Sequence, residues 1–151
     1  MAAAIIVVAG FAAACSSAAT APPAAAPAAS AGGPVVMTAT VGTQGTLLVA
    51  GANGMTVYTF SKDVANSGTS GCTGGCITKW PALTVPAGST PAGGSGVTGK
   101  LGMITRADDG STQVTYNGLP LYFYAGDKAP GDANGIYTGW SAVKPGATSS
   151  Y

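Results

Sequence analysis

A unit with the sequence Asn-Gly followed by Tyr-x-aromatic-x-x-Asp occurs twice in this 151-residue chain. In the first copy the Asn-Gly pair at 53–54 leads into the motif at 58–63, and in the second the pair at 117–118 leads into 122–127. A Trp followed by small and apolar residues comes after each motif. A chain that carries the same unit twice is expected to fold as two similar halves.

Both halves contain short runs of β-branched and aromatic residues bounded by Gly, Pro or Asn-Gly, which is the pattern of β-strands. The 24 glycines and 10 prolines favour many turns, and no segment repeats its apolar residues with the period of a helix. The Asn-Gly pairs at 53–54 and 117–118 predict tight hairpin turns. Strands are expected over 35–41, 46–50, 55–60, 101–106, 112–116 and 119–124.

These runs predict an all-β fold of two pseudo-symmetric antiparallel β-meander repeats, the first over about 45–83 and the second over about 110–143. A half of roughly 50 residues with few large apolar side chains is marginally stable by itself. The repeats are therefore expected to pack as one domain over 34–144, with a Gly-, Pro- and Ser-containing loop at 86–96 between them and a tail at 145–151.

Residues 1–15 have the features of an export signal. The apolar run over 2–11 is too short to span a bilayer, which needs about 20 apolar residues. The small residues directly before Cys15 resemble the lipobox of bacterial lipoproteins, in which the Cys is diacylated, although Ala12 stands where Leu is usual. We expect Cys15 to be lipidated. The alternative is a plain secretory signal, in which Cys15 has no special role and the protein is secreted.

Residues 16–33 consist only of Ala, Pro, Ser, Thr and Gly. Such a segment buries too little apolar surface to offset the entropy of ordering it. In an extended form of about 3.1 Å per residue, it reaches on the order of 50 Å. We therefore expect a tether that holds the domain away from a membrane surface.

The composition narrows the available chemistry. The chain has no histidine, and its five acidic residues are all Asp. Histidine is the usual general base near neutral pH and a common metal ligand, and without it or Glu a hydrolase or transferase has few candidate groups. Only 7% of the residues are charged, so no basic surface for nucleic acid is expected. We expect a protein that is not an enzyme, needs no cofactor and does not bind nucleic acid.

Cys72 and Cys76 are separated by Thr-Gly-Gly in a chain that is expected to be exported. Disulfides persist in oxidising compartments, and the two glycines let so short a loop bend until the sulfur atoms meet. We expect a structural disulfide that stabilises the fold by roughly 2 kcal/mol. The alternatives are a redox-active pair, for which the Cys-x-x-Cys spacing is absent, and a metal site, for which two thiolates are too few.

In each motif copy the two aromatic residues are two positions apart, hence on one face of a strand, and the Asp follows where the strand should end. One interpretation is that the aromatics fill the core and the Asp accepts backbone N–H groups of the next turn. The other is that the copies meet at a pseudo-twofold axis and form a shared ligand site. Its candidate residues are Tyr58, Phe60, Asp63, Tyr122, Tyr124 and Asp127.

Together, the two motifs, the Cys72–Cys76 loop that runs into Trp80, and the segment 113–122 resemble the bacterial secreted-repeat lipoprotein family, named for its Tyr-x-(Phe/Trp/Tyr)-x-x-Asp motif. The similarity covers about 47–143, with Ala82 where a second Pro is common. The resemblance implies an exported, usually lipid-anchored protein of unknown function, and it carries over no catalytic residues.

The function that we expect is a non-enzymatic, lipid-anchored β module on the outer face of the cytoplasmic membrane, which binds a small ligand or an envelope protein. The alternative is an accessory protein in extracytoplasmic electron transfer or in haem or metal handling. In that case Tyr58, Tyr122, Tyr124 or the cysteine pair would serve as ligands or as a redox couple.

Overall fold

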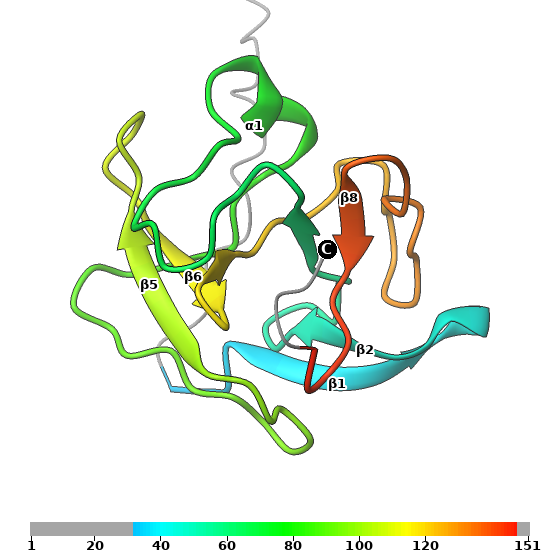
Figure 1. Ribbon diagram of the computed structural model, residues 1–151. Coiled ribbons are helices and arrows are strands. Elements are labelled where there is room, and N and C mark those ends of the chain that lie inside the picture. The colour runs from blue at the N-terminus through cyan, green and yellow to red at the C-terminus, as the bar shows by residue number, and fades with distance from the viewer. Residues whose placement is uncertain (1–31, 148–151) are drawn as a thin grey trace, which may run out of the picture.

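A computed structural model describes residues 32–147 and shows the all-β fold that the sequence predicts (Figure 1). The expected signal segment with Cys15, most of the tether (16–31) and the end of the tail (148–151) lie outside the described residues. The elements are β1 (Val36–Val41), η1 (Gly42–Gln44), β2 (Gly45–Ala50), β3 (Tyr58–Phe60), α1 (Gly75–Lys79), β4 (Thr84–Val85), β5 (Leu101–Thr105), β6 (Thr112–Tyr116), β7 (Leu119–Pro120) and β8 (Trp140–Ala142).

The strands form three antiparallel sheets. β1 pairs with β2, and β3 pairs with β8. In the third sheet β6 lies between β4 and β5 and also pairs with β7. In Figure 1 the β1–β2 pair crosses the lower part of the molecule, β5 and β6 lie on the left, and α1 lies at the top.

The two repeats interlock at the centre of the fold. The Tyr58 N–H donates to the Tyr122 carbonyl at 2.8 Å, and the Tyr122 N–H donates to the Tyr58 carbonyl at 3.0 Å. Equivalent residues of the two motifs therefore pair antiparallel, which is the relation of a pseudo-twofold axis. Each motif strand also pairs with the Trp segment of the other copy, because β3 pairs with β8 while Tyr122 bridges to Ala82.

The two Asn-Gly pairs form different turns. Asn117 and Gly118 both have positive φ, 49° and 83°, and make the tight hairpin between β6 and β7 that the sequence predicts. At the first pair only Gly54 has a positive φ, 68°, and the Ala50 N–H donates to the Met55 carbonyl in a wider turn. The short helix α1 was not expected, because five residues are too few to show a helical apolar period.

The core has an aliphatic and an aromatic part. The aliphatic part lies against the inner face of β6 and includes Val36, Leu48, Val57, Leu83, Val114 and Leu121. The aromatic part contains both motif tyrosines and both tryptophans, together with Cys72. The aromatic part lies at the pseudo-twofold axis, where the two repeats meet.

Candidate functional site

The two motif tyrosines reach the aspartates of the opposite copy. The Tyr58 hydroxyl donates to Asp127 Oδ2 at 2.6 Å, and the Tyr122 hydroxyl donates to Asp63 Oδ2 at 2.7 Å. Both tyrosines and both aspartates are buried. Each motif is therefore completed by a residue of the other copy, and the two repeats exchange their hydrogen-bond partners.

The second carboxylate oxygen of each aspartate fixes the loop that follows its strand. Asp63 Oδ1 accepts the Gly71 N–H at 2.6 Å. Asp127 Oδ1 accepts the backbone N–H of Asn134 at 2.9 Å and its side-chain amide at 3.2 Å. Each carboxylate thus accepts a hydrogen bond from a tyrosine of the other copy and from a backbone N–H of its own copy. This is the geometry expected if the aromatics fill the core and the Asp accepts backbone N–H groups of the next turn.

Burial perturbs the acid–base behaviour of this cluster. Desolvation raises the pKa of Asp63, although the Gly71 N–H and the Tyr122 hydroxyl both oppose this shift. Desolvation is also the largest reason why the pKa values of Tyr58 and Tyr122 lie far above the ordinary value for tyrosine, and the neighbouring carboxylates add to it. The two hydroxyls therefore stay protonated near neutral pH and serve as donors rather than as bases.

A stack of four aromatic rings crosses the same axis. Phe60 stacks on Trp140 with ring centroids 4.4 Å apart, Trp140 on Trp80 at 3.6 Å, and Trp80 lies against Tyr124 at 4.7 Å. The second aromatic of each motif thus packs on the Trp of the other copy, whereas the first aromatic lies edge-on against the Trp of its own copy. Both tryptophans are buried.

A model of the family described as a secreted repeat of unknown function matches residues 38–84 and 103–144. The chain belongs to this family. Each matched segment contains one motif and ends just after its Trp, and each begins before the start that we expected for the repeat, at about 45 and 110. Neither a curated protein nor a solved structure matches the chain.

In this secreted repeat the predicted disulfide joins Cys72 and Cys76. Cys72 is buried in the aromatic part of the core, and Cys76 is half-buried against it. The Cys76 carbonyl accepts the Trp80 N–H at 2.9 Å. The disulfide therefore holds the short segment that supplies Trp80 to the ring stack.

A buried arginine that the sequence analysis missed supports the cluster from one side. The Arg106 guanidinium donates to Ser70 Oγ at 3.1 Å, to the Cys72 carbonyl at 2.7 Å, and to the side chains of Gln113 and Asp108. Ser70 Oγ in turn lies 2.7 Å from the Tyr122 hydroxyl. The sequence signal was present, because this is the single arginine of the chain and it is followed by Asp108 and Asp109.

The ring stack of this secreted repeat is accessible at one end. Tyr137 is 40% exposed and lies 5.8 Å from Tyr124, between ring centroids. The Lys79 ammonium lies 5.2 Å from the Tyr137 ring and 5.9 Å from the Tyr124 ring. Lys79, Tyr124, the exposed Ile136 and Tyr137 are called the tyrosine patch below. At the Phe60 end of the stack, the residue before Trp140 is Gly139, whereas the residue before Trp80 is Lys79. The patch therefore has no equivalent at the Phe60 end, and it departs from the pseudo-twofold symmetry.

The six candidate ligand residues therefore divide into two groups. Tyr58, Asp63, Tyr122 and Asp127 are buried and bind one another, whereas Phe60 and Tyr124 are half-buried at the ends of the stack. A ligand that left the fold intact would reach only Phe60 and Tyr124. Their role in ligand binding remains a prediction.

Two further properties concern the described part of the chain. Within residues 32–147, no three His, Cys, Asp or Glu side chains are grouped so that they could hold a metal ion. No helix of that range is long and apolar enough to cross a membrane.

Proposed function

We propose that this secreted repeat is a non-enzymatic binding module that is anchored by a lipid at Cys15 to the outer face of the cytoplasmic membrane. The anchor and its tether are supported by the apolar run over 2–11, the small residues before Cys15 and the uncharged stretch at 16–33. The family is described as secreted, which agrees with export of the domain.

The observation that carries the proposal is the exchange of partners between the two motifs. The Tyr58 and Tyr122 hydroxyls and the carboxylates of Asp63 and Asp127 are buried and bind one another. Groups that are occupied in this way build a rigid frame, and they are poorly placed to act on a substrate. Recognition then falls to side chains on the surface of the frame.

The tyrosine patch is the surface best suited to recognition. Tyr124 and Tyr137 offer aromatic rings, and Lys79 offers an ammonium group beside both of them. Aromatic residues that are held by packing bury contact area at a low cost in conformational entropy. The matching partner is an envelope molecule with a flat apolar face, such as the face of a sugar ring, next to an anionic group.

The experiment that tests binding is native mass spectrometry of the protein purified from its own envelope. A bound mass is expected in the wild type, and it should be lost in Tyr137→Ala. It should be kept in Val64→Ala, which removes an even more exposed apolar side chain from another loop. Loss of the bound mass in both variants, or in neither, would contradict the assignment of the patch.

The anchor and the alternative function have separate readouts. Cys15→Ser should move the protein from the membrane fraction to the soluble fraction without changing its bound mass. A haem or metal absorbance that copurifies with the protein, or a Cys72–Cys76 pair that titrates at a physiological potential, would favour the redox or metal-handling alternative.

A further inference from the structure

β5 pairs with β6 along one side only. The Lys100 carbonyl and the Arg106 N–H, which flank β5, both bond to residues that flank β6. Because bonded positions alternate along an antiparallel ladder, the even-numbered residues between them also face β6. The N–H and carbonyl groups that face away from β6 belong to Leu101, Met103 and Thr105.

This free edge lacks the features that usually prevent strands from pairing. Folded proteins protect an edge with charged residues, Pro, a bulge or a covering segment. The strand Leu101–Thr105 has no charged residue and no Pro, and Met103 at its middle is 41% exposed. Among the described residues, none makes a backbone hydrogen bond to the outward groups.

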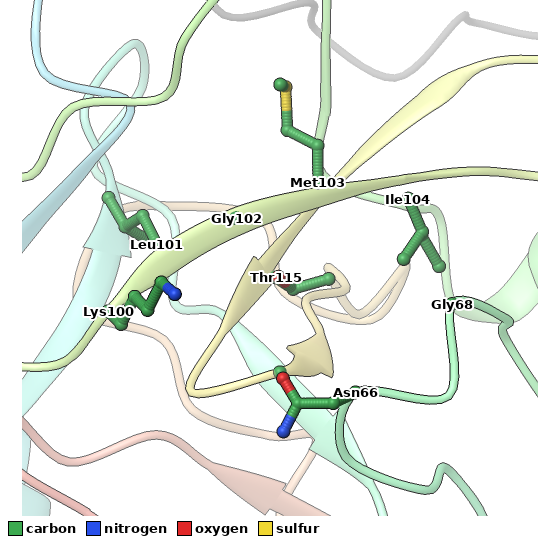
Figure 2. A pocket seen from close by; sticks show the side chains of 9 residues that line it. Asn66, Gly68, Lys100, Leu101, Gly102, Met103, Ile104 and Thr115 are labelled. Carbon is green, nitrogen blue, oxygen red and sulfur yellow. The ribbon is translucent and has the colours of Figure 1, made fainter.

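A groove of about 250 Å³ lies beside this edge (Figure 2). β5 forms one wall, and the loop that carries Asn66 and Gly68 lies across from it. Gly102 and Thr115 share the face of the sheet that borders the groove, because a Cβ at Gly102 would lie 2.9 Å from Thr115 Oγ1. Gly102 itself lines the groove, so a side chain from outside can approach its backbone there.

We propose that β5 pairs antiparallel with β5 of a second copy, with the two Met103 residues opposite each other on a twofold axis. The outward N–H and carbonyl groups of Leu101 then bond to those of Thr105 in the second copy. The outward groups of Met103 bond to those of Met103 in the second copy. Gly102 lies opposite Ile104 of the second copy, on the face that borders the groove. The space beside each Gly102 is thus filled by an isoleucine, at both ends of the interface.

The charges at the two ends of β5 agree with this arrangement. Lys100 precedes the strand, and Arg106, Asp108 and Asp109 follow it; because Arg106 pairs with Asp108 at 2.6 Å, this end keeps a net negative charge. The antiparallel arrangement brings Lys100 of each copy to the end where the acidic turn of the other copy lies. A parallel arrangement would instead place like charges side by side. The interface is small, so the dimer is expected to be weak.

Cysteine cross-linking tests the register. In a Cys15→Ser background, Met103→Cys should give a disulfide-linked dimer, because residues of a bonded antiparallel pair have Cα atoms about 5.5 Å apart, within the range of a disulfide. Thr105→Cys is the matched control, since its two copies would be separated by roughly 13 Å along the strands. At least about tenfold more linked dimer is expected from Met103→Cys, and addition of Leu101→Cys to Thr105→Cys should restore linking.

A proline variant tests whether pairing depends on the outward groups. Met103→Pro removes an N–H that faces away from β6, so the fold should keep its melting temperature while concentration-dependent dimerisation, measured by sedimentation velocity, is lost. Ile104→Pro removes an N–H that faces β6 and should lower the melting temperature. If Met103→Pro does not fold, Met103→Lys places like charges on the axis and should likewise abolish the dimer.

Three results would overturn the proposal. The first is equal linking of Met103→Cys and Thr105→Cys. The second is a wild-type protein that stays monomeric at every concentration and gives no linked dimer. The third is linking of Met103→Cys to a different protein without any homodimer, which would assign the edge to a heterologous strand.

Discussion

The exchange of hydrogen-bond partners predicts which residues of the two motifs are energetically coupled. Tyr122→Phe removes the donor to Asp63 Oδ2 and leaves this buried oxygen without its partner. A hydrogen bond to a charged group contributes about 1.5–3 kcal/mol, so we expect the free energy of unfolding to fall by roughly 2–3 kcal/mol. For a domain of this size the melting temperature should fall by roughly 10 °C.

A double-mutant cycle then identifies the partner. Tyr122→Phe combined with Asp63→Ala should show a coupling energy of about 1.5 kcal/mol or more, because both changes remove the same hydrogen bond. Tyr122→Phe combined with Asp127→Ala, the aspartate of its own motif, should be additive to within about 0.5 kcal/mol. Urea unfolding followed by the fluorescence of the buried tryptophans measures all four corners of each cycle. Stronger coupling within a motif than between motifs would refute the exchange.

Two further predictions concern packing and pH. Gly135→Ala places a Cβ within 3.0 Å of the Tyr58 and Trp80 rings and should destabilise the fold by about 1–3 kcal/mol, whereas Gly75→Ala in α1, where a Cβ meets nothing within 4 Å, should be neutral or slightly stabilising in the same urea assay. Because burial raises the pKa of Asp63 above its unfolded value, the wild type should lose stability relative to Asp63→Asn as the pH rises from about 4 through the folded pKa. Asp132→Asn is the control of opposite sign, because the N–H groups of Lys128 and Ala129 lower the pKa of Asp132. The wild type should lose stability relative to this variant as the pH falls. Urea midpoints are measured between pH 3 and 7, and a difference between wild type and variant that changes in the same direction for Asp63→Asn and Asp132→Asn would contradict these pKa shifts.

The sequence predicted the local elements and the duplication because both are written in short patterns. The β-branched runs, the Asn117-Gly118 hairpin and the Cys72–Cys76 disulfide depend on neighbours in the chain, and each is present in the structure. The pairing of β3 with β8 could not be read in the same way. The apolar pattern of a motif strand is equally compatible with pairing to the Trp segment of its own copy or of the other copy. Only the packing of both copies determines which tyrosine binds which aspartate.

The parts of the candidate site that sequence reasoning missed have a common cause. Lys79 and Tyr137 approach each other only because the α1 segment and the loop before β8 end at the same side of the ring stack. β6 is covered on both faces, so the polar side chain of Gln113 on this strand is buried and needs a hydrogen-bond partner. The buried Arg106 supplies that partner. The contacts of Lys79 with Tyr137 and of Arg106 with Ser70 and Cys72 join residues that are far apart in the chain, so no spacing pattern predicts them.

The exchange of hydrogen-bond partners between the two motifs also explains why the repeat occurs twice within one chain. In one copy Tyr58 and Asp63 lie on the same short strand and the turn after it, and each binds a residue of the other copy. A single copy would therefore leave its Tyr hydroxyl and one oxygen of its Asp carboxylate without their partners, at a cost of about 1–3 kcal/mol for each neutral group and more for a charged one. It would also lack the Trp against which its own second aromatic packs. One repeat can then be stable only beside a second, and covalent duplication supplies that second repeat without the entropy loss of bringing two chains together.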